Sequence, residues 1–288
     1  MSTAPIWHGV VQAAQANFYR VGVTNTEGSD PRSLTANPST QAILCTCRTR
    51  LKKMGYQVMV GDRVQFVLGG ETTASDASDQ RGAIIAIEPR SSLLSRPAIA
   101  NLDQVMVVFA LAEPELDPYR LSRFLVQAET TGLPVQLCLN KCDLLTQAEQ
   151  QGWVERLRRW GYDPLLVSAR TGEGVPELLQ VCTDQISVLM GLSGVGKSSL
   201  LNRLVPDLNL PTQAVSGRLQ QGRHTTRHVE LFPLQGTSGW VADSPGFNQV
   251  ERYHCPSQDL IQCSQRSGSV LAAVSFAIVC TSRTLDVR

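Results

Sequence analysis

The sequence predicts a small all-β barrel followed by an α/β domain with a mostly parallel, doubly wound sheet. Two observations support this prediction. The first ninety or so residues hold short apolar runs with few helix signals, and from about residue 101 buried-strand runs alternate with helical spacing. A chain of 288 residues is long enough for more than one domain. We expect the barrel in residues 1–90, the α/β domain in 97–250 and a separate C-terminal segment in 251–288.

The expected barrel strands are short. In chain order, the apolar runs are His8–Ala14, Asn17–Val23, Ile43–Arg50, Gln57–Leu68 and Gly82–Ile87. The fourth run is broken by a Gly-Asp pair, which is a turn signal. Five short strands with a basic segment suggest a barrel of the oligonucleotide-binding (OB) kind.

Basic residues gather in one part of this region. The formal net charge of the chain is only +1, so no global field indicates nucleic acid. Between residues 42 and 70, however, there is a single acidic residue, Asp62, and five basic ones, Arg48, Arg50, Lys52, Lys53 and Arg63. This segment is either a solvated loop or a surface that binds RNA.

The cysteines and apolar runs indicate a cytoplasmic protein. The eight cysteines are scattered along the chain, and reduced thiols are the default in the cytoplasm. No signal segment is recognisable, and the apolar run Val270–Cys280 is too short to cross a bilayer. We therefore expect a cytoplasmic monomer without membrane contact.

Strands and helices alternate from about residue 101 onward. Gln104–Leu111 is a continuous apolar run, as expected of a strand buried on both faces. The other expected strands are Val135–Leu139, Leu165–Val167, Ile186–Met190, His228–Leu234 and Trp240–Ala242, and the expected helices are Pro118–Thr131, Trp153–Trp160, Val175–Cys182 and Ser198–Leu204. This order is typical of a mostly parallel sheet covered by helices.

A glycine-rich loop follows the strand Ile186–Met190 and opens the next helix, which is the setting of a phosphate-binding loop. Its backbone N–H groups and the helix N-terminus would surround the β-phosphate of a nucleotide. Lys197 would reach the β- and γ-phosphate oxygens, and the Ser198 hydroxyl would bind Mg²⁺. The residues assigned to nucleotide binding here are Gly191, Leu192, Ser193, Gly194, Val195, Gly196, Lys197, Ser198 and Ser199.

The tetrapeptide Asn140-Lys141-Cys142-Asp143 follows a buried strand and supplies a carboxylate for base recognition. Asp143 can accept two hydrogen bonds from N1 and N2 of guanine, whereas adenine has no such donor pair, so it would select GTP over ATP. Asn140 would bridge to the phosphate loop, and the Lys141 stem would cover the base. At the end of a later strand, Ser168-Ala169-Arg170 fits the loop whose backbone supports the base.

Asp243-Ser244-Pro245-Gly246 follows the strand Trp240–Ala242. In a nucleotide site, Asp243 would hold Mg²⁺ through water and the Gly246 N–H would contact the γ-phosphate. The same four residues are also typical of a simple turn, which is the alternative interpretation. Many GTPases place a water-orienting glutamine directly after this element, where Phe247 stands here, so we expect slow intrinsic hydrolysis or a water positioned from elsewhere.

The segment 222–227 lies between the phosphate loop and Asp243, where the first switch of a GTPase belongs. Either Thr225 or Thr226 would bind Mg²⁺ and the γ-phosphate in the GTP state. His224 either positions the attacking water or is merely a loop histidine.

The base-reading tetrapeptide precedes the phosphate loop, whereas most GTPases have the opposite order. With Ser168-Ala169-Arg170, the segment 222–227 and Asp243-Ser244-Pro245-Gly246 in their places, the chain resembles the ribosome small-subunit-dependent GTPases. These circularly permuted P-loop GTPases act late in assembly of the bacterial 30S subunit. The resemblance covers about residues 8–263, including the Val60–Val64 turn of the barrel. It implies that the barrel binds ribosomal RNA, that the small subunit stimulates GTP hydrolysis, and that His224 is the catalytic residue.

The resemblance fails in the C-terminal segment. The family has a zinc domain with ligands spaced Cys-x4-Cys-x-His-x5-Cys, and His254, Cys255, Cys263 and Cys280 lack that spacing, so we assign no zinc ligand in this chain. Codons can be written for the tail such that reading one base earlier restores the family's spacing. We hypothesise that a one-base loss just after the Cys263 codon, either in the gene or in its determination, left a degraded, poorly ordered zinc-domain remnant. A genuinely divergent tail is the alternative.

The predicted activity is hydrolysis of GTP to GDP and phosphate with Mg²⁺, by a protein that binds the small ribosomal subunit and its rRNA. One alternative is a slow or inactive GTP-binding module that only gates RNA attachment. A second is a non-functional product, because the altered tail exposes apolar surface. An ATP-using enzyme would require nucleotide binding that does not depend on the carboxylate of Asp143.

Overall fold

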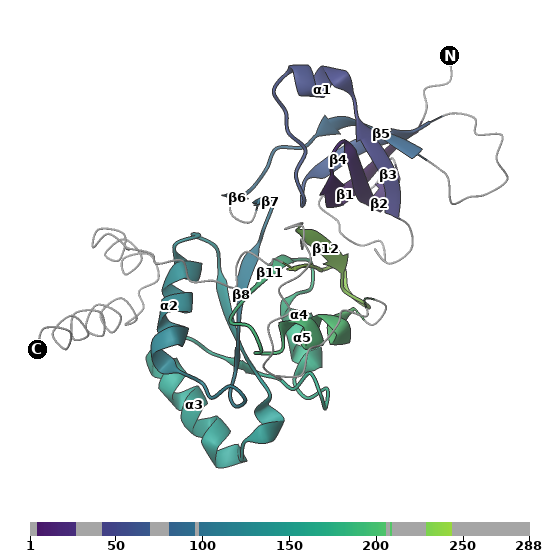
Figure 1. Ribbon diagram of the computed structural model, residues 1–288. Helices are drawn as coiled ribbons and strands as arrows, with labels where there is room; N and C mark the ends of the chain where they lie inside the picture. Colours follow the sequence, from purple (N-terminus) through teal and green to yellow (C-terminus); the bar gives the residue numbers. More distant parts are fainter. Residues whose placement is uncertain are drawn as a thin grey trace, which may run out of the picture. The chain divides into compact units, whose positions relative to one another are not determined.

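The computed structural model describes residues 5–26, 42–69, 81–95, 98–205, 208 and 229–243. The chain forms two compact units. The first contains the described residues up to Asp103 together with Gln180–Val188 and 229–243, and the second contains Gln104–Leu179 and the described residues from Leu189 to Leu208. Figure 1 labels most of the elements of both units.

The first unit is built on a closed five-stranded barrel. Its strands are, in spatial order, β1 (Ile6–Gln15), β2 (Phe18–Thr26), β3 (Ala42–Cys47), β5 (Arg81–Ile87) and β4 (Arg63–Leu68). Strand β4 pairs back with β1, so the barrel closes. Buried and exposed side chains alternate along β3, where Ile43 and Cys45 face the core and Leu44 is exposed. The predicted OB-type barrel is confirmed.

The turn before β4 is held by buried polar contacts. Asp62 is fully buried, and its two carboxylate oxygens accept hydrogen bonds from Arg90 at 2.7 and 2.9 Å. Gly61 has a φ of +87°, and a Cβ there would lie 2.1 Å from the Ala100 carbonyl oxygen. Only glycine fits at this position. The Gly-Asp pair that signals a turn in the sequence therefore also carries buried packing.

Two parts of the first unit differ from the sequence prediction. The strand expected over residues 43–50 ends at Cys47, and the helix α1 (Thr49–Lys53) follows it. Its Lys, Arg and Leu residues are good helix formers, so propensity overrides a short alternating pattern. The antiparallel pair β6 (Leu93–Ser95) and β7 (Ala98–Ala100) was not predicted. Strands of three residues are too short to show a period.

Strands from late in the chain also join the first unit. They are β12 (Glu230–Pro233), β13 (Trp240–Asp243) and residues 186–188 of β11 (Ile186–Met190). Strand β13 runs parallel to β11, with Ala242 opposite Val188, and antiparallel to β12. Strand β12 in turn pairs with β1 of the barrel, with Glu230 opposite Ala13.

The second unit contains three parallel strands with helices, as predicted. Strand β9 (Val135–Asn140) lies between β8 (Gln104–Ala110) and β10 (Leu165–Leu166), and every residue of β8 is buried. The helices are α2 (Pro118–Glu129), α3 (Gln147–Arg159), α4 (Val175–Val181) and α5 (Lys197–Leu204), α4 continuing into the first unit. On α2, Phe124 meets Phe109 of β8 edge-on, with ring centroids 5.3 Å apart.

Helix α3 begins earlier than the predicted Trp153. Thr146 and Glu149 form a capping box, in which the Thr146 side chain accepts from the Glu149 N–H and the Glu149 side chain accepts from the Thr146 N–H. The pattern Thr-x-x-Glu is visible in the sequence and could have placed this start.

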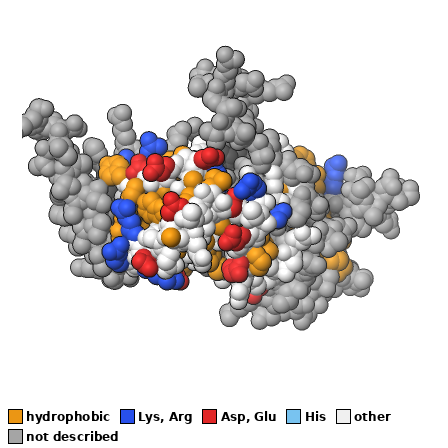
Figure 2. Space-filling view, turned by 90° about the horizontal axis from the view of Figure 1, so that it is seen from below, with side chains coloured by type: hydrophobic (Ala, Val, Ile, Leu, Met, Phe, Trp, Pro, Cys, Tyr) orange, Lys and Arg blue, Asp and Glu red, His pale blue; other side chains and the backbone are white. Residues whose placement is uncertain are grey.

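The described surface carries mixed charge. On the face shown in Figure 2, basic and acidic side chains of the described residues are interspersed, in keeping with a net charge of +1. Among the described residues, no helix is long and apolar enough to span a membrane.

Candidate nucleotide-binding site

The phosphate loop leads from β11 into α5, the arrangement that the sequence predicts. Two of its glycines are required by close neighbours. A Cβ at Gly191 would lie 2.1 Å from the Val108 carbonyl oxygen, and one at Gly196, where φ is +94°, would lie 2.3 Å from Asn140 Nδ2. The loop therefore packs tightly against the ends of β8 and β9.

The Lys197 ammonium lies on its own loop. Nζ donates to the carbonyl oxygens of Gly191 at 3.0 Å and Leu192 at 2.7 Å. Lysine keeps three rotatable donors, so it can exchange these carbonyls for phosphate oxygens without any change in the backbone.

Asn140 joins three segments of the site. Its side chain, in a residue only 1 % exposed, donates from Nδ2 to the Val195 carbonyl of the phosphate loop at 2.9 Å. Its Oδ1 accepts the Ala169 backbone N–H at 3.1 Å. The bridge to the phosphate loop is as predicted from the sequence, and the contact with Ala169 also brings the Ser168-Ala169-Arg170 loop to the same place.

Asp143 is a largely buried carboxylate with partners from that loop. Arg170 donates to Asp143 Oδ2 from Nε at 2.9 Å and from a terminal nitrogen at 2.5 Å. Burial by itself raises the pKa of Asp143, but hydrogen bonds from Ser168 and Arg170, with the Arg170 charge, outweigh it and hold the pKa below its ordinary value. The carboxylate is therefore ionised at neutral pH.

The other two members of the tetrapeptide have different surroundings. Lys141 adopts a left-handed conformation with φ of 62°, and its Nζ donates to the Glu113 carbonyl oxygen. Cys142 is fully buried. Burial, reinforced by the neighbouring Glu173, raises the pKa of the Cys142 thiol to about 11, so this thiol stays neutral and contributes packing.

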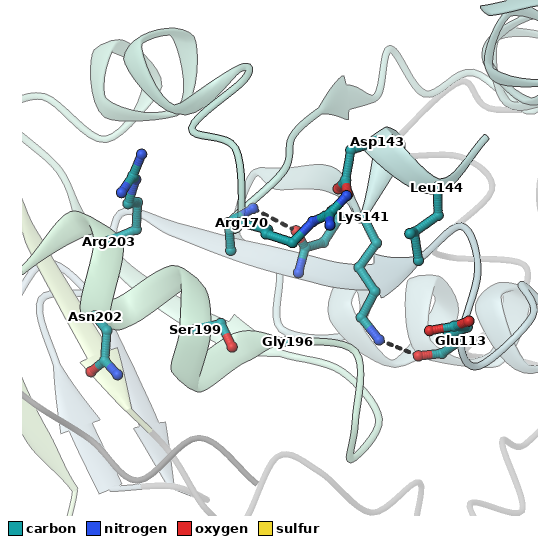
Figure 3. A pocket seen from close by; sticks show the side chains of 11 residues that line it. Glu113, Lys141, Asp143, Leu144, Arg170, Gly196, Ser199, Asn202 and Arg203 are labelled. Atoms are coloured by element: carbon teal, nitrogen blue, oxygen red, sulfur yellow. Dashed lines mark hydrogen bonds and ion pairs between the residues drawn. The ribbon is translucent and has the colours of Figure 1, made fainter. Parts of the chain in front are cut away.

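Some of these residues line one pocket of about 630 Å³, whereas Cys142, Gly191 and Lys197 are not part of its lining. Figure 3 shows Lys141 turned towards Glu113 and Arg170 lying beside Asp143, with Ser199 and Asn202 on the neighbouring helix. The predicted residues in the lining are Asn140, Lys141, Asp143, Ala169, Arg170, Gly196 and Ser199. A volume of several hundred Å³ is that of a small-molecule or cofactor site.

Sequence reasoning missed four lining residues, namely Glu113, Leu144, Asn202 and Arg203. Asn202 and Arg203 stand three and four residues after Ser199 on α5, so helical spacing could have found them. Glu113 lies in the loop after β8 with a positive φ of 51°, and no sequence signal points to that conformation.

Several predicted site residues lie outside the described residues, namely His224, Thr225, Thr226 and Gly246. Asp243 is the last residue of β13. Because Ala242 pairs with Val188 in parallel register, β13 and β11 end at the same edge of the sheet, and the phosphate loop starts directly after β11.

A search of protein families matches residues 87–253 to the RsgA GTPase family. A small ribosomal subunit biogenesis GTPase RsgA of Trichormus variabilis is 46 % identical over 278 residues, covering 93 % of this chain and 73 % of the relative. The chain belongs to the RsgA GTPase family. A protein of the same name from a Synechococcus strain is 49 % identical over 251 residues, covering 87 % of this chain and 77 % of the relative.

Solved structures with the same fold agree with family membership. YjeQ from Thermotoga maritima aligns with a TM-score of 0.67 at 29 % identity, covering 90 % of this chain and 82 % of that one. YloQ, described as a circularly permuted GTPase, aligns with a TM-score of 0.65 at 30 % identity, covering 90 % and 77 %. As an RsgA GTPase, the chain is a hydrolase acting on GTP, with a circularly permuted domain behind an OB-type barrel.

The described part of the chain contains no cluster of three or more His, Cys, Asp or Glu side chains that could hold a metal ion. The zinc-domain remnant expected at 251–288 lies outside the described residues.

The basic residues assigned to RNA divide between two elements. Arg48, Arg50 and Lys53 are exposed in and next to α1, and the side chain of Lys52 is outside the described part. Arg63 is the half-buried first residue of β4. Exposed apolar residues follow α1, with Met54 at 61 % and Tyr56 at 52 % exposure.

Proposed function

We propose that this chain hydrolyses GTP to GDP and phosphate during late maturation of the small ribosomal subunit, and that the subunit stimulates the reaction. The observation that carries the proposal is Asn140, which ties the base-reading segment to the phosphate loop and to Ala169 around one pocket. The role in small-subunit biogenesis is taken from the names of its relatives.

Asp143 is the residue that we assign to guanine. Its carboxylate is ionised and lies in the pocket, and the Asp143 side chain is only 9 % exposed. An ionised carboxylate accepts hydrogen bonds from N1–H and N2–H of guanine. With a base that lacks these donors, the carboxylate oxygens would be left unpaired, which is costly. The backbone of 168–170 supports the base, and the Lys141 stem covers it.

The phosphates are assigned to the loop Gly191–Gly196 and to Lys197, at the N-terminus of α5, where backbone N–H groups favour an anion. The oxygen donors present suit Mg²⁺, which prefers hard oxygen ligands. Ser198 and Asp243, with Thr225 or Thr226, would hold the ion. When bound, Mg²⁺ neutralises charge on the β- and γ-phosphates.

Hydrolysis forms a bond between a water oxygen and the γ-phosphorus and breaks the bond from that phosphorus to the β–γ bridging oxygen, which leaves on GDP, while the water gives up a proton to the phosphate product or to solvent. Lys197 stabilises the charge that develops on the leaving oxygens. His224 is assigned to position the water, in place of the glutamine that Phe247 replaces. The hydrolysis proceeds without a covalent intermediate on the protein.

We assign RNA binding to the barrel in residues 1–90, through Arg48, Arg50, Lys52, Lys53 and Arg63. The exposed side chains of α1 present charge for phosphates, and the exposed Tyr56 ring offers a face on which a base can stack. The GTPase domain is placed at 97–250. The tail 251–288 remains assigned to a frame-shifted zinc-domain remnant.

Multiple-turnover GTP hydrolysis by the full chain, measured with and without purified 30S subunits, tests the proposal. We expect a slow basal rate and a marked increase with subunits. A chain that binds GTP but never turns it over, with or without subunits, would instead be a binding module. Failure to express as a soluble protein with a cooperative unfolding transition would favour a non-functional product.

A further inference from the structure

In this structure, the Asp143 carboxylate is engaged by a side chain of the protein itself. Both hydrogen bonds from Arg170 reach the same oxygen, Oδ2, at 2.9 and 2.5 Å. The two partners differ sharply in exposure, since the Asp143 side chain is 9 % exposed and the Arg170 side chain 74 %. Figure 3 shows the Arg170 guanidinium lying against Asp143 within the pocket.

A guanidinium group and the edge of guanine present the same donors. Guanine carries N1–H and the N2 amino group on neighbouring positions of an N–C–N unit, and arginine carries Nε–H and a terminal N–H₂ in the same relation. Guanine pairs one donor with each carboxylate oxygen, so it needs Oδ2, whose lone pairs Arg170 occupies. With Ser168 bonded to that carboxylate as well, it cannot serve Arg170 and guanine fully at the same time.

We propose that Arg170 is an internal competitor of guanine, which binds to Asp143 until the nucleotide displaces it. The proposal rests on the proposed function, because it takes Asp143 to be the guanine reader. It assigns to the Arg170 side chain a role separate from the backbone of its loop. Arg170 lowers the affinity for guanine nucleotides and slows their association.

The exposure of the pair sets the size of the effect. Arg170 can swing into water without breaking any core packing, because three quarters of its side chain is already exposed. Its charge is therefore screened, and exposed ion pairs are weak, but the carboxylate end is largely buried. A competitor bound in most molecules reduces apparent affinity by the fraction that is open. We expect removal of Arg170 to tighten GDP binding about three- to tenfold.

Stopped-flow binding of a fluorescent GDP, mant-GDP, to the full chain tests this. In R170A, the association rate constant should rise about three- to tenfold while the dissociation rate constant stays unchanged, because only the nucleotide-free protein loses an interaction. R170K keeps the charge but not the two-donor fork, so its association rate constant should lie between those of wild type and R170A. A lower or unchanged association rate in R170A overturns the proposal, as does a change confined to dissociation.

Two controls separate competition from general electrostatics. Arg203 lines the same pocket, but its guanidinium contacts the Thr171 carbonyl oxygen, so R203A removes an equal charge without freeing Asp143 and should not accelerate binding. In D143N, the amide suits xanthosine diphosphate, whose C2 carries a carbonyl, and offers Arg170 no carboxylate. Adding R170A to D143N should leave xanthosine diphosphate binding unchanged, and an equal gain there also overturns the proposal.

The outcomes also distinguish this inference from the proposed function. If the wild-type chain binds no mant-GDP, or if D143N keeps the full preference for guanine, the proposed base reading fails and the competitor role fails with it. If guanine binding depends on Asp143 but R170A gains nothing, the competitor role alone fails. Thermal unfolding of R170A should stay cooperative, with a melting temperature slightly below that of wild type, because only one exposed ion pair is lost; this checks that the fold is intact.

Discussion

Replacing Asn140 with alanine tests the bridge on which the site depends. The substitution leaves two backbone groups without their partner, the Val195 carbonyl oxygen and the Ala169 N–H. A buried polar group left unpaired costs about 1–3 kcal/mol. Because the space vacated can admit one water, which repays part of this cost, we expect N140A to lose about 2–4 kcal/mol of unfolding free energy.

Two measurements detect this loss of unfolding free energy. For a domain of this size, 1 kcal/mol shifts the melting temperature by about 2–4 °C, so the transition should fall by about 5–15 °C. Hydrogen exchange gives the local readout, because Asn140 accepts the Ala169 N–H. That amide should lose its protection in N140A and keep it in N140D, since the aspartate still offers an acceptor but cannot donate to Val195.

A second substitution tightens the test. A methyl group at Gly196 would lie 2.3 Å from Asn140 Nδ2, so G196A should displace the Asn140 side chain. In N140A that collision is absent. The double variant N140A/G196A should therefore be destabilised by about 1–2 kcal/mol less than the sum of the two single variants. Full additivity, or an N140A protein that melts within 2 °C of wild type with Ala169 still protected, would refute the reasoning.

Four further outcomes are expected. D143N should lose guanine preference by at least about 100-fold, since a site built for hydrogen bonds discriminates strongly; competition of GDP and xanthosine diphosphate for a fluorescent nucleotide measures it. Because the pKa of Asp143 is lowered in the folded chain, the stability from its ionised form is fully present above the unfolded pKa of about 3.9 and is lost as pH falls through the folded pKa; melting curves between pH 3 and 7 should show this acid loss reduced in D143N. The triple variant R48A/R50A/K53A should lower affinity for 30S subunits and weaken its salt dependence by a slope of about 2–3, while GTP turnover without subunits stays unchanged; binding at several salt concentrations checks both. Resequencing the gene should locate a one-base loss after the codon for residue 263, either as a deletion in the gene or as a base that the present sequence lacks. An intact gene in the present frame, together with a C-terminal peptide found by mass spectrometry, would establish the tail as genuine.

Much of the fold could be predicted because period and burial act over many residues. The fully buried strand β8 reads as a continuous apolar run, and α2 carries both its apolar stripe and its Asp117 cap. Short elements escaped for the opposite reason. The helix α1 has five residues and β6 and β7 have three each, so neither period repeats often enough to be recognised.

The contacts of the candidate site also divide into those that the sequence could predict and those that it could not. Asn140 and Gly196 could be predicted because one tetrapeptide and one glycine loop each need particular residues at fixed spacing. The contact between Arg170 and Asp143 could not, since it joins residues 27 positions apart through a flexible side chain. Glu113 enters the pocket through a positive φ and not through its residue type. Backbone conformation of this sort leaves no mark in composition or periodicity.

Circular permutation gives the end of the nucleotide-binding fold an unexpected neighbour. Within the described residues, the strand that ends at Asp243 is hydrogen-bonded to β12, and β12 is paired with β1 of the barrel. Arg20 on β2 also forms an ion pair with Glu230 on β12. Backbone pairing can transmit displacement from one strand to the next, because a strand cannot shift without breaking its ladder. The barrel that we assign to RNA is therefore joined through β12 to the strand that we assign to Mg²⁺, independently of the tail.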